Sequence, residues 1–326
     1  MAKARGLDAR LERLRALRQE PASPEHVAEL RKALADKSNL VAAEAAEIVG
    51  ARLLAELTPD LVAAFDRFMV DPAETDKLCR AKLAIVETLN KLEYDQEAIF
   101  LTAIRHVQME PRWGTSEDAA ADLRGSAAFG LVRLNYRDVV LLLVDLLLDR
   151  EKVARMAAAQ ALGETRAPAA IPLLRYKARL GDKDSEVTAE CLAALMVAAP
   201  VESLPFVTRF LNSADEALQQ GAAFALAESR RADALAVLKD HYAKARRSSL
   251  QEVLLLAISM TRLPAGLEFV FEVLAGDDRT AAQAALAALA IHRHNDSVHE
   301  RVAALVAQKQ DTALQERFRK KFSKGR

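Results

Sequence analysis

Residues 123–147 read LRGSAAFGLVRLNYRDVVLLLVDLL, and residues 154–180 read ARMAAAQALGETRAPAAIPLLRYKARL. When Leu131 is aligned with Leu162, both stretches show one pattern: a segment rich in alanine and other small residues, a turn, and a segment rich in leucine. Alanine, leucine, glutamate, lysine and arginine have the highest helix propensities. Each stretch therefore predicts two helices joined by a short turn.

This helix pair recurs along most of the chain. The small-residue segments are centred at intervals of 41, 42, 31, 33, 31, 32 and 31 residues, on Ile48, Leu89, Leu131, Leu162, Leu195, Leu226, Ile258 and Leu289. One helix pair cannot bury its apolar face alone, so repeats of this length indicate pairs that stack and share a continuous core. We predict an all-α fold, a right-handed α-solenoid of about eight helix pairs with helical caps.

Composition supports this prediction and limits the function. Apolar residues make up 51% of the 326 residues but aromatic residues only 5%, and 11 glycines and 10 prolines are too few for a protein with many β-turns. The net charge is zero, with +4 in residues 1–18, +5 in residues 316–326 and −9 between them. A chain that wraps nucleic acid usually has a basic body. Nucleic acid is therefore not the expected partner.

The same composition gives expectations about compartment. Cys79 and Cys191 lie among apolar residues of helical segments and predict buried thiols rather than disulfides. The N-terminal residues lack the apolar core of a signal peptide, and the longest apolar run, 139–148, is interrupted by Asp145 and too short to span a bilayer. We expect a cytoplasmic, monomeric protein without a transmembrane segment.

Three regions follow from the pattern. Residues 1–37 predict an N-terminal helical cap, with helices at 7–19 and 24–36. Residues 38–308 predict the solenoid, with long repeats over 38–150 and regular repeats over 151–308. Residues 309–326 predict a basic C-terminal helix or tail that continues the helix before it.

The repeat around Leu162 resembles the HEAT repeat, in the short form named after phycocyanobilin lyase subunits. The matching features are Arg155, Ala158, Ala159, Ala161, Leu162, Gly163 and the Ala-x-x-x-Leu spacing of Ala170 to Leu174. Other repeats depart from this pattern, with Met196, Ala227 and Ser259 at the position of Gly163 and with Thr188 and Gln219 at that of Arg155. The resemblance implies the solenoid fold, but it does not imply one function, because this repeat serves many roles.

In HEAT-like repeats the small-residue helix is expected to line the concave face. Exposed positions on that helix lie about one turn apart between the core positions. We expect a groove for a protein or peptide segment, formed by apolar and mainly acidic residues: Phe129, Arg133, Met156, Gln160, Glu164, Glu190, Phe224, Glu228, Glu252, Leu256 and Met260. The alternative is that these side chains pack against neighbouring repeats, since a register error of one residue would move Phe129 and Phe224 into the core.

Two repeats are about ten residues longer than the others. The additional residues fall at 69–79 and 107–123, and the second insertion contains Arg112 and the single tryptophan, Trp113. Inserted loops of repeat proteins often carry function, so Arg112 and Trp113 form a second candidate binding site. The alternative is a surface loop whose tryptophan covers the end of a helix.

Catalytic and metal-binding patterns are weak. His292, His294 and His299 could supply zinc ligands, but the segment reads as a turn without a nearby cysteine, and we predict no metal and no cofactor. The sequence also lacks a glycine-rich phosphate loop and a recognisable nucleophile, so we predict a non-catalytic scaffold or adaptor. Two alternatives stay open: an adaptor that binds nucleic acid or an anionic membrane through its basic ends, including Phe318 and Phe322, and, least favoured, a HEAT-like lyase.

Overall fold

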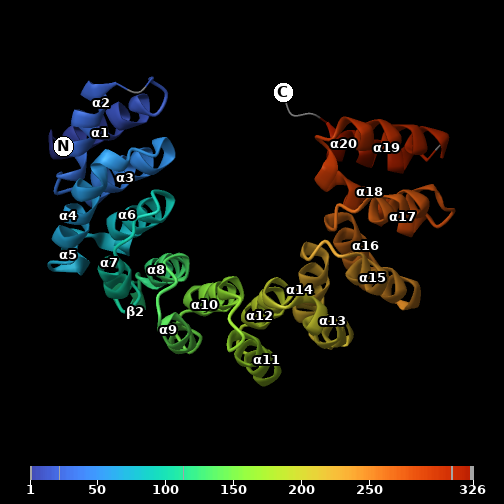
Figure 1. Ribbon diagram of the computed structural model, residues 1–326. Coiled ribbons are helices and arrows are strands. Elements are labelled where there is room, and N and C mark those ends of the chain that lie inside the picture. The colour runs from blue at the N-terminus through green and yellow to red at the C-terminus, as the bar shows by residue number, and fades with distance from the viewer. Residues whose placement is uncertain (1, 22, 113, 310, 324–326) are drawn as a thin grey trace. The chain divides into compact units, whose positions relative to one another are not determined.

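The computed structural model describes residues 2–21, 23–112, 114–309 and 311–323, with side chains from residue 6 onwards. The described residues are mainly helical, as predicted (Figure 1). They divide into two compact units, Met1–Ala161 and Leu162–Arg326. We describe each unit by itself.

In both units the helices form two rows. The small-residue row contains one helix at each predicted centre: α3 (Asn39–Arg52), α6 (Arg80–Lys91), α8 (Ala121–Arg133), α10 (Lys152–Thr165), α12 (Ser185–Ala198), α14 (Glu216–Glu228), α16 (Ser248–Met260) and α18 (Arg279–Leu289). The leucine row contains α4 (Thr58–Phe68), α7 (Glu97–Ala103), α9 (Val139–Leu146), α11 (Ala170–Leu180), α13 (Pro200–Thr208), α15 (Ala232–Lys244), α17 (Pro264–Ala275) and α19 (Asp296–Gln308). The eight helix pairs confirm the predicted fold class.

Helices of the small-residue row pack on one another and on the leucine row. In unit 1, α3 packs on α6 and α6 on α8; in unit 2, α12 packs on α14, α14 on α16 and α16 on α18. The core between the rows is made mainly of leucine and alanine, including Leu89, Leu131, Leu162 and Leu226, each fully buried. Each predicted repeat centre is therefore a core residue.

Small residues allow neighbouring helices to approach closely. A Cβ atom placed on Gly163 would lie 2.8 Å from both the Cα and the carbonyl oxygen of Ala194 on the next helix of the row. These are backbone atoms, which cannot rotate away. Gly163 is therefore required by helix packing rather than by a turn.

We expect Gly163→Ala to lower the free energy of unfolding by about 1–3 kcal/mol, because the added methyl group overpacks the contact between α10 and α12. Gly6→Ala is the matched control, since a Cβ on Gly6 meets no atom within 4 Å. Urea unfolding followed by circular dichroism measures both. Equal midpoints for Gly163→Ala and the parent protein would contradict this packing.

The terminal helices extend the rows. α1 (Ala2–Leu17) packs on α3, and α2 (Pro24–Leu34) packs on α3 and α4, so the N-terminal pair continues both rows of unit 1. At the other end, α20 (Thr312–Phe322) packs on α18 and α19. The basic C-terminal segment is thus a separate helix and does not continue α19, because Asp311 caps α20 by accepting hydrogen bonds from the N–H groups of Ala313 and Leu314.

The two insertions contact each other. Residues 107–118 contain an antiparallel hairpin, β1 (Met109–Arg112) and β2 (Thr115–Asp118), and residues 71–79 contain α5 (Pro72–Thr75) and a 3₁₀ turn. Gln108 Nε2 donates to the carbonyl oxygen of Asp76 (2.8 Å), and the N–H of Leu78 donates to Glu110 Oε1 (2.7 Å). The additional residues of two successive repeats thus form one paired structure on unit 1.

The first insertion has an unusual backbone. Asp71, Leu78 and Cys79 have φ angles of 45°, 60° and 54°, in the left-handed region that disfavours residues with a side chain. Such conformations cost about 1–3 kcal/mol each and persist only where surrounding contacts impose them. Within this insertion, Asp76 forms a buried ion pair with Lys82 and accepts hydrogen bonds from the N–H groups of Ala81 and Lys82.

Candidate functional site

The small-residue row of unit 1 carries two adjoining grooves. One, of about 580 Å³, lies between α6, α8 and α10; the other, of about 430 Å³, lies between α1, α3 and α6. Leu83 and Glu87 line both grooves. The remaining lining residues of the larger groove are Asn90, Lys91, Asp122, Gly125, Ser126, Phe129, Val153 and Ala157.

The structure places Phe129 on this groove, half-buried rather than in the core. Arg133, one turn further along α8, contacts Tyr94 and Phe100 instead. Its Nη2 donates to the carbonyl oxygen of Tyr94 (2.6 Å), and its guanidinium lies 5.8 Å from the centre of the Phe100 ring. Arg133 therefore braces α8 against the neighbouring repeat.

Leu83 and Glu87 were not among the predicted groove residues, although the sequence contains the signal for them. Leu89 and Leu131 are separated by 42 residues, and the same offset relates Leu83 to Gly125 and Glu87 to Phe129. The predicted groove residues begin at Phe129 on α8, one repeat after Leu83 and Glu87. Extending the groove pattern one repeat back predicts both residues.

Charges in the unit 1 grooves nearly balance. Their lining contains the carboxylates of Glu44, Glu47, Glu87 and Asp122 and the cations of Arg15, Arg80 and Lys91. Burial raises the pKa of Glu87; Lys91 opposes this rise, and Glu47 and Asp122 add to it. The surface is therefore amphipathic without a dominant charge.

The small-residue row of unit 2 is different. Helices α12, α14 and α16 contain five glutamates and no lysine, arginine or histidine. Phe224, Leu256 and Met260 are half-buried, and Val197 is 50% exposed. Among the predicted groove residues of this unit, Glu190 is half-buried, and those that are exposed are Glu164, Glu228 and Glu252.

The two predicted residues of α10 that belong to unit 1 also reach its surface. Met156 is half-buried and Gln160 is exposed. Every predicted groove residue is thus at least partly accessible. Phe129, Arg133, Met156 and Gln160 belong to unit 1, and the other predicted groove residues belong to unit 2.

Glu190 is an acid of the unit 2 face with a shifted pKa. Burial raises the pKa of Glu190, and the nearby carboxylate of Glu228 raises it further. Within the described part of the chain, Glu190, Glu228 and Glu252 have neither a hydrogen bond nor an ion pair within 4.0 Å. These three carboxylates therefore have no cationic partner among the described residues.

Comparison with known proteins agrees with the repeat pattern. The family model for HEAT repeats matches residues 112–196. Residues 112–196 thus contain HEAT repeats. The matched range runs from the end of β1 into α12, and it includes the repeat in which the sequence resembled this family.

Two solved structures are similar to this chain at low identity. A chain from the complex of CpcE and CpcF of phycocyanin lyase from Nostoc sp. PCC7120 is 19% identical, with 72% of this chain and 91% of that chain covered and a TM-score of 0.39. An engineered protein is also 19% identical, with 98% and 95% covered and a TM-score of 0.38. No curated protein matches the sequence.

We expect Glu190→Gln to stabilise the free fold at neutral pH. Because the folded-state pKa is raised, the unfolded chain ionises first as the pH rises, and the parent protein loses stability from about pH 4 upwards. Glutamine does not ionise, so the Glu190→Gln variant does not lose this stability. The gain in melting temperature should be small near pH 4 and larger near pH 7.

The control for this prediction is Glu216→Gln on α14, which removes the same charge from an exposed residue that pairs with Arg247 at 2.9 Å. It should give no stabilisation. A Glu190→Gln gain that does not depend on pH would show that the carboxylate is not the cause.

The predicted loop site is only partly described. Arg112 is exposed at the end of β1 and pairs with Glu117 on β2. Trp113 lies outside the described residues. The hairpin contacts the 71–79 insertion, whereas Phe129 lines the groove between α6, α8 and α10. A binding site at Arg112 and Trp113 stays a prediction.

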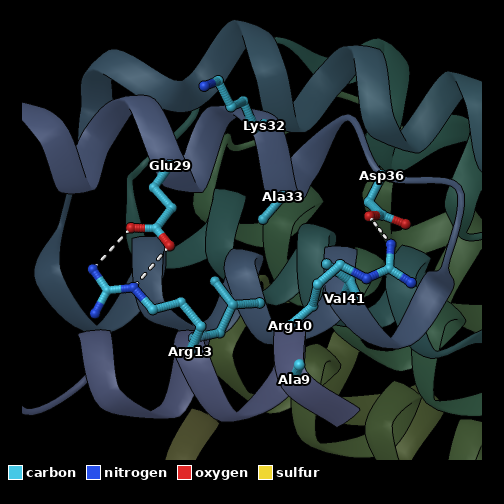
Figure 2. Close-up of a pocket in the computed structure, with 9 residues that line it drawn as sticks. Ala9, Arg10, Arg13, Glu29, Lys32, Ala33, Asp36 and Val41 are labelled. Carbon is cyan, nitrogen blue, oxygen red and sulfur yellow. Dashed lines mark hydrogen bonds and ion pairs between the residues drawn. The ribbon is translucent and has the colours of Figure 1, made fainter. Parts of the chain in front are cut away.

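A third hollow, of about 310 Å³, lies between α1, α2 and the start of α3. Figure 2 shows that ion pairs cross it: Arg13 binds both carboxylate oxygens of Glu29 (2.9 and 3.0 Å), and Arg10 pairs with Asp36. These contacts join the first two helices to each other. The hollow therefore lies at the packing interface between the two helices of the N-terminal cap.

The histidine segment is not assembled as a metal site. His292 Nε2 lies 3.0 Å from the carbonyl oxygen of Ser259, and Arg293 Nε lies 3.2 Å from His294 Nε2. His299 lies against the ring of Phe318 at 5.5 Å. Over the described residues, no group of three or more histidine, cysteine, aspartate or glutamate side chains could hold a metal ion.

The basic ends are partly engaged within the fold. On α20, Phe322 is buried and stacks on Phe318 at 5.0 Å, so the aromatic face that could enter a membrane packs on His299 instead. On α1, Arg10 and Arg13 form the ion pairs described above. In the described part of the chain, no helix is long and apolar enough to span a membrane.

Proposed function

We propose that this HEAT-repeat protein is a non-catalytic scaffold that holds a segment of a partner protein on the small-residue face of unit 2. HEAT repeats are suited to such a role, because stacked helix pairs present a long continuous surface. The observation that carries the proposal is the set of accessible apolar side chains on adjacent helices, Phe224 on α14 with Leu256 and Met260 on α16.

On each of the two helices, these side chains belong to a row along one face. Residues four apart on a helix share one face, so α14 presents Gln220, Phe224 and Glu228 in a row, and α16 presents Glu252, Leu256 and Met260 in a parallel row. Complete burial of one phenylalanine, leucine or methionine side chain contributes about 1.5–3 kcal/mol. Two such rows supply enough apolar contact for a specific, reversible complex.

The double substitution Phe224→Asp and Leu256→Asp should abolish the binding of a specific partner, because two carboxylates would occupy the centre of the apolar rows. The tagged full-length protein and the variant are purified from the cells that produce the protein, and associated proteins are quantified by mass spectrometry. At least one associated protein should be lost from the variant.

The control is Tyr176→Asp on α11, a leucine-row residue that is 69% exposed. It should retain the associated protein. Circular dichroism and melting temperature establish that both variants are folded. Retention of every associated protein by the double variant, or an equal loss with Tyr176→Asp, would contradict the proposal.

A further inference from the structure

The unit 2 face combines its accessible apolar side chains with a negative charge. Helices α12, α14 and α16 adjoin one another and carry glutamate as their only charged residue type (Figure 1). Two of the five are engaged at the edge of the face: Glu216 pairs with Arg247, and Glu186 has contacts of its own. Glu190, Glu228 and Glu252 are left as uncompensated acids.

Each of these three acids lies beside an apolar position. Glu228 follows Phe224 by one helical turn on α14, and Glu252 precedes Leu256 by one turn on α16. On α12, Glu190 and the exposed Val197 are seven residues, about two turns, apart on the same side of the helix. The face therefore alternates apolar and anionic positions along all three helices.

The proximity of Glu190 to Glu228 is unfavourable in the free protein. Glu190 is half-buried, and no cation of the described residues pairs with either carboxylate. Like charges on neighbouring helices repel, and burial removes part of the hydration of Glu190. A cation bound between them would relieve both effects.

The same face offers few hydrogen-bond donors. Between their ends its helices satisfy their own backbone groups, and their exposed side chains are apolar or carboxylate, with Gln220 as an amide and with Ser248 and Ser249 as hydroxyls at the start of α16. An extended peptide would leave its carbonyl oxygens without partners on such a surface. A helix satisfies its own backbone and needs only apolar contact and cation–carboxylate pairs.

Resting on the proposed function, we infer that the occupant of this face is a basic amphipathic helix. Its apolar stripe would lie on Phe224, Leu256 and Met260. Lysine or arginine residues beside that stripe would pair with Glu190, Glu228 and Glu252. An acidic helix would be repelled, as would nucleic acid.

Three fluorescent synthetic peptides of equal length serve as probes of the full-length protein by anisotropy. The first is an amphipathic helix with a leucine stripe flanked by lysine. The second replaces each lysine by glutamate, and the third contains the residues of the first in an order that destroys the stripe. We expect the first to bind at least about tenfold more tightly than either of the others, which corresponds to about 1.4 kcal/mol.

Substitutions then locate the interaction. Glu190→Gln with Glu228→Gln should weaken the first peptide about tenfold while raising the melting temperature of the free protein. Glu216→Gln should leave the affinity within about twofold, because that acid lies in a surface ion pair. Higher salt should reduce the affinity of the parent protein more than that of the double variant.

The outcomes separate this inference from the function on which it rests. Acidic and basic peptides that bind equally, both dependent on Phe224, would overturn the charge selectivity and leave the scaffold function intact. Equal binding of the scrambled basic peptide would show charge attraction without a helix and would overturn the inference. Absence of binding by every peptide would overturn the inference, and the purification with the double aspartate variant would decide the scaffold function separately.

Discussion

Asp76→Ala lowers the free energy of unfolding by about 3–5 kcal/mol, because it leaves a buried ammonium group without its counter-charge. Asp76 and Lys82 are both fully buried, and Lys82 Nζ lies 3.0 Å from Asp76 Oδ2. The other contact of this ammonium group is the carbonyl oxygen of Phe68, at 3.2 Å. Urea unfolding followed by circular dichroism measures the loss.

Lys82→Met should cost less than Asp76→Ala. The Asp76 carboxylate also accepts hydrogen bonds from the N–H groups of Ala81 (2.9 Å) and Lys82 (3.0 Å) and from Asn39 Nδ2 (3.1 Å), and these remain when the lysine side chain is shortened. Glu74→Ala, an exposed substitution in the same insertion, should stay within about 0.5 kcal/mol of the parent protein. A loss for Asp76→Ala no larger than for Glu74→Ala would show that the pair does not hold the insertion.

Arg124→Met should also destabilise unit 1 by about 3–5 kcal/mol. The Arg124 side chain is 4% exposed, pairs with Asp118 at 2.7 Å and binds both oxygens of Asp149 at 2.8 and 2.9 Å. Its Nη1 also donates to the carbonyl oxygen of His106 (2.9 Å). Methionine would leave two largely buried carboxylates without a cation, which the same unfolding measurement would detect.

Arg124→Lys should recover only part of this loss, because an ammonium group cannot bind both oxygens of Asp149 and reach Asp118 in the same geometry. The matched control is Arg137→Ala, whose side chain is 89% exposed and pairs with Asp138 only at 3.6 Å. It should change stability by less than about 0.5 kcal/mol. Full recovery of stability in Arg124→Lys would contradict the arrangement in which Arg124 binds both oxygens of Asp149 and also pairs with Asp118.

The regular part of the architecture could be predicted from sequence because its determinants are local. Leu131, Leu162 and Leu226 mark helices by the spacing of small and large apolar residues, and that spacing is repeated in each pair. The same spacing keeps Phe129 and Phe224 out of the core, and both are half-buried in the structure. Because the pattern recurs in each helix pair, several repeats independently give the same assignment of core and surface positions.

The insertions could not be predicted in this way. Their structure depends on contacts between residues far apart in the chain, such as Gln108 with Asp76 and Leu78 with Glu110. Neither the hairpin nor the buried pair of Asp76 and Lys82 has a periodic signal. Arg124 illustrates the same limit, since its burial follows from two aspartates, one before and one after it in the chain.

Only part of the groove could be predicted from the sequence, for a related reason. Its residues on α8 follow from the repeat pattern, and Leu83 and Glu87 follow from the same pattern at an offset of 42 residues. The difference in charge between the two faces does not follow from periodicity. It depends on side chains from other helices, such as Arg15 on α1 and Arg80 on α6, which balance the acids of unit 1.

The central claim is that the small-residue face of unit 2 holds a partner helix. The most direct test is photo-crosslinking of the full-length protein with the basic amphipathic peptide, which carries a photoreactive group in its leucine stripe. Mass spectrometry then locates the crosslinked residues. We predict crosslinks on α12, α14 and α16, concentrated around Phe224 and Leu256 and lost in the double aspartate variant. Crosslinks concentrated on the leucine row, on α11, α13 or α15, would contradict the claim.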